Sequence, residues 1–171
     1  MRISIRTHAI VKLDVHYDSI NESHQIKELY FAILSKVFLD KPALIITITP
    51  QKKYSIGYEL GSFQEINIEK SKYLVNNLQA CSSSMLAEIS RSEEFGRGLL
   101  LLMVSNKGLI ENVKSVLRYI GNNIGIENIS SEIIFCENDG NSLCLYNTTI
   151  DSEELKSISK KITGDVVMAT S

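Results

Sequence analysis

The residues best suited to chemistry lie in one segment, YLVNNLQACSSSMLAEISR, at residues 73–91. Its cysteine, Cys81, follows a stretch typical of an inner strand and precedes Ser82, Ser83 and Ser84, which favour a helix start. Free amides and the helix dipole at such a turn stabilise a thiolate and lower the pKa of the thiol. The thiolate could attack a thioester carbonyl while the amides stabilise the oxyanion. The alternative is that Cys81 is a small buried apolar residue.

A metal site is not expected. His8, His16 and His24 all lie in the first 24 residues, and the even spacing of His8 and His16 is that of one strand face. No third and fourth ligand accompanies them, so surface histidines are the simpler interpretation. Cys81, Cys136 and Cys144 show no CxxC spacing, which indicates free thiols in a reducing compartment.

Two glycine-containing segments resemble ligand loops only superficially. EEFGRG, at Glu93–Gly98, follows a predicted helix and precedes a predicted strand. A phosphate or dinucleotide loop needs the opposite order, so no bound cofactor is expected. Glu137–Gly140 has two carboxylates and a glycine but lacks the other oxygen ligands of a calcium loop. A hairpin turn is the expectation there.

Charge and composition exclude several partners. The 171 residues include 18 basic and 20 acidic ones, for a net charge of −2, and neither a nucleic acid nor a membrane surface is an expected partner. The N-terminus has no apolar core of a signal peptide, and the longest apolar run, Leu99–Val104, is too short to span a bilayer. The expected location is the cytoplasm.

The periodicity of apolar residues predicts the elements that must position Cys81. Residues 11–17 alternate apolar and polar, as in a half-buried strand, whereas the apolar residues of 26–38 follow one helical face, with Asn21 or Ser23 as the cap. The run at 43–49 is typical of a strand buried on both faces. Further strands are expected at 66–68, 73–80, 98–105, 133–136, 143–146 and 166–169, and further helices at 82–95, 109–120 and 152–161.

Strands that alternate with helices favour one α/β domain, residues 1–171, with a mainly parallel or mixed sheet covered by helices on both faces. No linker, repeat or low-complexity tract divides the chain.

The segment QACSSSMLA, at Gln79–Ala87, resembles the nucleophile segment of the thiolase and beta-ketoacyl synthase (ketosynthase III type) superfamily. ALIITITP at 43–50 and GLLLLMVSN at 98–106 resemble the strands that flank this segment in the family. The resemblance implies a thiolase-like half-fold, with Cys81 as the acyl acceptor and its own backbone amide as an oxyanion donor.

The chain also departs from that family. Family members are about twice as long and draw a histidine from their second half, whereas no histidine follows Cys81 here, and Cys136 and Glu137 stand in a segment that can be aligned with a histidine-bearing one. The resemblance therefore implies a reduced member and not a complete condensing enzyme. One alternative is an acyltransferase that forms a thioester at Cys81, with acyl-CoA or an acyl carrier protein as the donor. The other is a catalytically incomplete partner of a larger synthase subunit. The setting would be fatty-acid, polyketide or other natural-product biosynthesis, and the protein would be a dimer or hetero-oligomer because half a fold leaves an apolar flank uncovered.

A second hypothesis belongs to another class. The chain could be a non-enzymatic binding protein, of the immunity or inhibitor type, that acts through surface complementarity and carries an acidic exposed patch. An unrelated enzyme is a third option. The surroundings of Cys81 discriminate between the first two, because an acyl acceptor needs a reachable thiol and a core residue does not.

Overall fold

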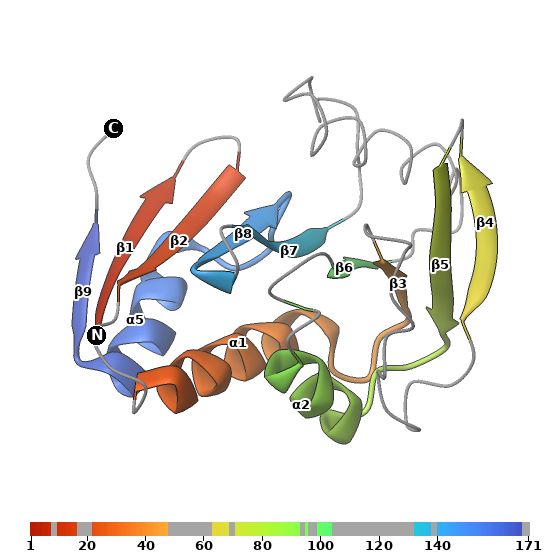
Figure 1. The fold of residues 1–171 in the computed structure, drawn as a ribbon. Coiled ribbons are helices and arrows are strands. Elements are labelled where there is room, and N and C mark those ends of the chain that lie inside the picture. Colours follow the sequence, from red (N-terminus) through yellow and green to blue (C-terminus); the bar gives the residue numbers. More distant parts are fainter. Residues whose placement is uncertain are drawn as a thin grey trace.

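The described strands form a single nine-stranded sheet, and the three helices of the described residues lie on one of its faces (Figure 1). The computed structural model describes residues 1–7, 10–16, 22–47, 63–68, 71–92, 95, 99–103, 132–137 and 140–168. The strand order is β4-β5-β3-β6-β7-β8-β2-β1-β9. The elements are β1 (Arg2–Thr7), β2 (Ile10–His16), α1 (Ser23–Phe38), β3 (Ala43–Thr47), β4 (Gln64–Ile68), β5 (Ser71–Leu78), α2 (Ser83–Arg91), β6 (Leu99–Met103), β7 (Ile133–Glu137), β8 (Ser142–Tyr146), α5 (Ser152–Thr163) and β9 (Asp165–Met168).

The sheet is mixed, which confirms one of the two expected arrangements, and the described strands are not mainly parallel. Seven of the eight neighbouring pairs are antiparallel, and only β1 and β9 run parallel. The reason is the length of the connections. The strands of the pairs β1–β2, β4–β5 and β7–β8 follow each other closely in the chain, and short connections can join only antiparallel neighbours.

Helix α1 crosses the sheet beneath the strands and connects its two halves (Figure 1). It leaves β2 and leads to β3, and three strands lie between these two in the sheet. Its 16 residues span about 24 Å, and four strand spacings amount to about 19 Å, so the helix is long enough for this crossing. The seven apolar residues of its predicted face are all buried, as expected: Ile26, Leu29, Tyr30, Ile33, Leu34, Val37 and Phe38.

The core lies between the sheet and the three helices. Strands β1 and β2 point alternate apolar side chains into it, among them Ile3, Ile5 and Leu13. This confirms the predicted half-buried strand for residues 11–16, and the rest of that prediction lies outside the described residues. The buried residues of β3 belong to both faces of the sheet, because Ala43 to Ile46 are all buried. That strand was predicted correctly as an inner one.

Helix boundaries follow local signals with one exception. Asp151 caps α5 by accepting from the amide of Glu154, and Gly164 ends the helix with a φ of 81°. Such a φ favours glycine because it has no Cβ. The exception is α1, whose N-cap is Glu22 and has no side-chain capping bond, so the predicted cap at Ser23 is wrong. Asn21 and the predicted helix at 109–120 lie outside the described residues.

Candidate functional site

Cys81 lies between β5 and α2, at the turn that the sequence predicts. Its amide donates to the carbonyl of Lys41 over 2.9 Å, and its carbonyl accepts from the amide of Asp40 over 2.9 Å. Leu39 and Cys81 also form a short parallel bridge. The residues after α1 and the residue before α2 are therefore joined through their backbones, and we call residues 39–41 with Cys81 the interhelix clamp.

The interhelix clamp occupies the backbone amide of Cys81, which was the expected oxyanion donor. An amide that already donates within the fold is not free to stabilise an oxyanion. The expectation that the amide of Cys81 serves this purpose is therefore wrong for this conformation. The following residue, Ser82, is the N-cap of α2, and its hydroxyl accepts from the amide of Met85 over 3.2 Å. The predicted helix start is correct, and one of the amides of its first turn, that of Met85, is already bonded to the capping serine.

The thiol of Cys81 is sealed in the core. The residue has 0% exposure and belongs to the same apolar cluster as Phe38, Leu78 and Leu86. Burial raises the pKa of Cys81 to about 11, because a thiolate loses its hydration there. The sequence predicted a lowered pKa from the helix dipole, and that prediction is wrong because the buried thiol is desolvated and its pKa is raised.

The other two cysteines are also buried, and both face away from solvent in the β7–β8 hairpin. Burial raises the pKa of Cys136 well above its ordinary value. Burial, followed by the nearby charge of Glu137, raises the pKa of Cys144 to about 12. All three thiols are thus protonated at neutral pH.

The position of the preceding strand also differs from expectation. β5 leads to Cys81 and was expected near the centre of the sheet, but it lies between β3 and the edge strand β4. A short antiparallel pairing with β4 places β5 there. β6 lies further inside, between β3 and β7.

The histidines do not converge in the described part of the chain. His16 is exposed on β2 and His24 is exposed near the start of α1, whereas His8 lies outside the described residues. Within the described ranges, no group of three or more histidine, cysteine or acidic side chains is placed to hold a metal ion.

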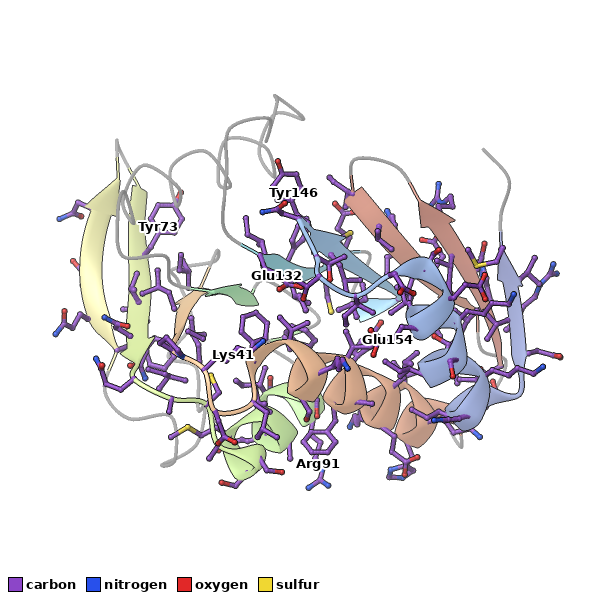
Figure 2. The ribbon with its side chains drawn as sticks, turned by 180° about the vertical axis from the view of Figure 1, so that it is seen from behind. Lys41, Tyr73, Arg91, Glu132, Tyr146 and Glu154 are labelled. Carbon is purple, nitrogen blue, oxygen red and sulfur yellow. The ribbon has the colours of Figure 1, made fainter. Side chains whose placement is uncertain are left out.

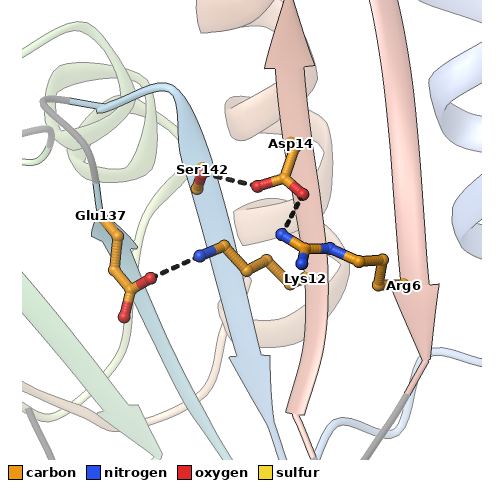
Figure 3. A network of polar contacts seen from close by, with 5 residues as sticks. All are labelled: Arg6, Lys12, Asp14, Glu137 and Ser142. Carbon is orange, nitrogen blue, oxygen red and sulfur yellow. Dashed lines mark hydrogen bonds and ion pairs between the residues drawn. The ribbon is translucent and has the colours of Figure 1, made fainter. Parts of the chain in front are cut away.

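A polar network instead occupies the sheet face opposite the helices (Figure 3). Asp14 on β2 is contacted from both neighbouring strands, because Arg6 on β1 forms an ion pair with it and Ser142 on β8 donates a 2.8 Å hydrogen bond. Lys12, two residues earlier on β2, reaches across β8 to Glu137 on β7 with an Nζ–Oε2 distance of 2.7 Å. We call these five residues the polar network.

The network favours the charged forms of Asp14 and Lys12. Burial alone would raise the pKa of Asp14, but hydrogen bonds from Ser142 and Arg6 and the positive charges outweigh it and lower that pKa. Burial likewise opposes the charge of Lys12, yet its hydrogen bond and ion pair with Glu137 raise the pKa of the lysine. Asp14 and Lys12 are therefore stabilised in their charged forms by these partners.

The sequence indicates only part of this network. Alternation shows that Lys12 and Asp14 share the polar face of a strand, and Glu137 was correctly assigned to the start of a hairpin turn. The pairing of Lys12 with Glu137 spans 125 residues and depends on β8 lying between β2 and β7. No short segment of the sequence indicates that β8 lies between β2 and β7 in the sheet.

Comparisons with known proteins give no relative. No family model, no curated protein and no solved structure matches the chain. Among the helices that the structure describes, none combines the length and the apolar character needed to cross a membrane.

Proposed function

We propose that this chain is a non-enzymatic binding protein that recognises a partner protein through the exposed polar face of β2, β1 and β9. The observation that carries the proposal is the closed environment of Cys81. Its thiol has no exposure, its pKa is raised to about 11, and its amide is already bonded to Lys41. Acyl transfer would require this part of the core to open, whereas binding requires no change there.

The polar face has the properties of a recognition surface. The register aligns Asp165, Arg2 and His16 in one row across β9, β1 and β2, and all three are exposed. The next rows contain Asp14 and Arg6 of the polar network. These side chains stand on paired strands, so a partner meets charges whose positions are fixed before binding.

The charge of this face is mixed and not acidic. Arg2, Arg6 and Lys12 accompany Asp14 and Asp165, so the acidic patch expected for an inhibitor-type protein does not occur on this face. The exposed side chain of Arg6 is 48% accessible, whereas that of Asp14 is 15% accessible. A partner therefore meets the guanidinium groups first, and a surface with carboxylates opposite Arg2 and Arg6 fits best.

Apolar contact contributes little to the exposed surface that the structure describes. In that part of the chain, Leu39 and Val167 are the large apolar side chains that are exposed, and Leu39 directly follows α1 whereas Val167 lies on β9. A large uncovered apolar flank was the reason to expect a dimer or a second half-domain. The described surface supports a polar, salt-sensitive interface instead.

The test compares two double variants with the same change in charge. Arg2→Glu/Arg6→Glu alters the polar face, and Lys160→Glu/Lys161→Glu alters the exposed last turn of α5. Each immobilised protein, with native circular dichroism verified, is exposed to an extract of its source cells. We expect at least one protein that the wild type and the α5 variant retain and that the polar-face variant loses.

Two results would overturn the proposal. One is retention that is equally strong with the polar-face variant, or no specific retention at all. The other is acylation of native Cys81 by acetyl-coenzyme A, detected as a mass increase that Cys81→Ala abolishes.

A further inference from the structure

A groove lies between α1 and α2, on the helical layer and away from both Cys81 and the polar network. It has a volume of about 430 Å³, which falls within the range of about 300–1,000 Å³ for small-molecule sites. Its lining consists of His24, Lys27, Glu28, Phe31, Ser90 and Arg91.

The spacing of residues on α1 explains how one helix supplies most of the groove. Lys27 follows His24 by three residues and Phe31 follows Lys27 by four, so the three side chains occupy one side of the helix. Arg91 comes from the last turn of α2, and Figure 2 shows its side chain pointing away from the sheet. Two elements far apart in sequence thus place cationic groups around one half-buried aromatic ring.

The groove is positively charged although the chain as a whole has a net charge of −2. Lys27 and Arg91 carry two positive charges, and Glu28 supplies one negative charge. Within the described part of the chain, neither cation forms an ion pair with another described residue, in contrast to Lys12 and Lys36. Both cations are therefore available to a ligand.

We propose that this groove binds a small organic anion that has an aromatic or branched aliphatic body. A carboxylate would be held by the planar guanidinium of Arg91 and the ammonium of Lys27. The body of the ligand would lie against Phe31, whose side chain is half-buried and lines the groove with apolar surface. This site is independent of the protein-binding face proposed above, because the two surfaces share no residue.

The test uses 4-(trifluoromethyl)benzoate as the probe and follows its fluorine NMR line width during titration of the full chain. The uncharged 4-(trifluoromethyl)benzamide has nearly the same shape and serves as the matched probe. We expect the benzoate to bind and the benzamide to bind at least about tenfold more weakly, which corresponds to about 1.4 kcal/mol. Binding of the benzoate should also weaken as the sodium chloride concentration rises.

Variants then locate the site. Lys27→Gln/Arg91→Gln should weaken benzoate binding by about tenfold or more. Lys160→Gln/Lys161→Gln removes the same charge from α5 and should leave the affinity within about twofold. Phe31→Leu keeps an apolar side chain but removes the ring, and it should weaken both probes by a similar factor.

The proposal is wrong if native protein does not broaden the benzoate signal at millimolar probe concentration. It is equally wrong if benzamide binds as well as benzoate, or if the two lysine substitutions on α5 have the same effect as the groove variant. Native circular dichroism of each variant excludes unfolding as the cause of a lost signal.

Discussion

The two faces of the sheet differ in how accessible their candidate functional residues are to solvent. On the helical side, Cys81 is surrounded by core residues and its backbone is held by Lys41 and Asp40. On the other side, Arg6 and Asp14 stand on regular strands and remain in contact with solvent. A motif that suggested catalysis lies in the part of the fold least accessible to a substrate, and residues with no recognisable motif lie where a partner can reach them.

This difference shows that position in a motif and accessibility are separate properties. The turn from β5 to α2 places Cys81 between a strand and a helix, as the sequence indicates. Backbone hydrogen bonds then join this turn to the residues after α1, so Cys81 has a structural role there. In the polar network, cross-strand pairing keeps charged side chains in fixed positions without enclosing them.

The largest difference in stability loss is expected between substitutions on the two faces of one strand, β2. Leu13→Ala removes a fully buried side chain from the core face of β2, and we expect a loss of about 2–5 kcal/mol in the free energy of unfolding. Lys12→Ala, on the opposite face of the same strand, removes a partly exposed ion pair with Glu137 and should cost less than about 1 kcal/mol. Urea unfolding followed by circular dichroism measures both values. Equal losses would show that the polar face is part of the core.

The second prediction concerns the three thiols at alkaline pH. A raised pKa in the folded state means that folding favours the protonated thiol, so this contribution is complete below about pH 9 and is lost as the pH rises through about 11 for Cys81. Cys144 extends the loss towards pH 12. We expect the free energy of unfolding to fall between pH 9 and 11, by about 2–3 kcal/mol for Cys81 alone.

Cys81→Ala provides the control for this effect. The alanine variant should be less stable at pH 7, because it leaves a small cavity, but its decline above pH 9 should be shallower than that of the wild type. Native protein should also react slowly with Ellman's reagent at pH 8, and all three thiols should react once guanidinium unfolds the chain. Rapid labelling of Cys81 in the native protein would contradict the sealed environment.

The secondary structure could largely be read from the sequence because it depends on short-range periodicity. The seven apolar positions of α1 recur at helical spacing, and all of them are buried as predicted. The alternation in β2 and the turn between β7 and β8 were equally local signals. The first strand, β1, was missed although Ile3 and Ile5 alternate with polar residues, because those residues were considered only as a possible signal peptide.

The sheet topology and the state of Cys81 could not be read in the same way. Whether strands pair parallel or antiparallel depends on which neighbours they meet, and β3 meets β5 and β6, which follow it by more than 20 residues. The pKa of Cys81 depends on its burial in an apolar cluster that includes Phe38, more than 40 residues earlier in the chain. The charges of the polar network come from β1, β2 and β7, and its hydroxyl, that of Ser142, comes from β8, so no single segment contains the pattern.

A third prediction sharpens the description of the polar network at low pH. The pKa of Asp14 is lowered by its partners, so its contribution to stability is complete above the ordinary pKa near 3.8 and is lost as the pH falls through the lower, folded value. Asp14→Asn lacks this titration. The difference in stability between wild type and variant should therefore be largest near neutral pH and shrink below pH 4. A difference that stays constant down to pH 2 would show that Asp14 is not stabilised as an anion.

The smallest effect is expected for an ion pair that joins two helices at the surface. Lys36 of α1 contacts Glu154 of α5 over 2.7 Å, and the pair raises the pKa of the lysine. The lysine side chain is 54% accessible, so water and salt screen the interaction. Lys36→Ala should therefore leave the free energy of unfolding almost unchanged, which distinguishes this exposed pair from the partly buried one between Lys12 and Glu137.

A double-mutant cycle for each pair, measured at low and at high sodium chloride, gives the two coupling energies. We expect the Lys12–Glu137 coupling to be the larger and the less sensitive to salt, because Lys12 is 24% accessible and lies between paired strands. If the Lys36–Glu154 coupling is the larger, the sheet does not hold the polar network more firmly than the surface holds an isolated pair.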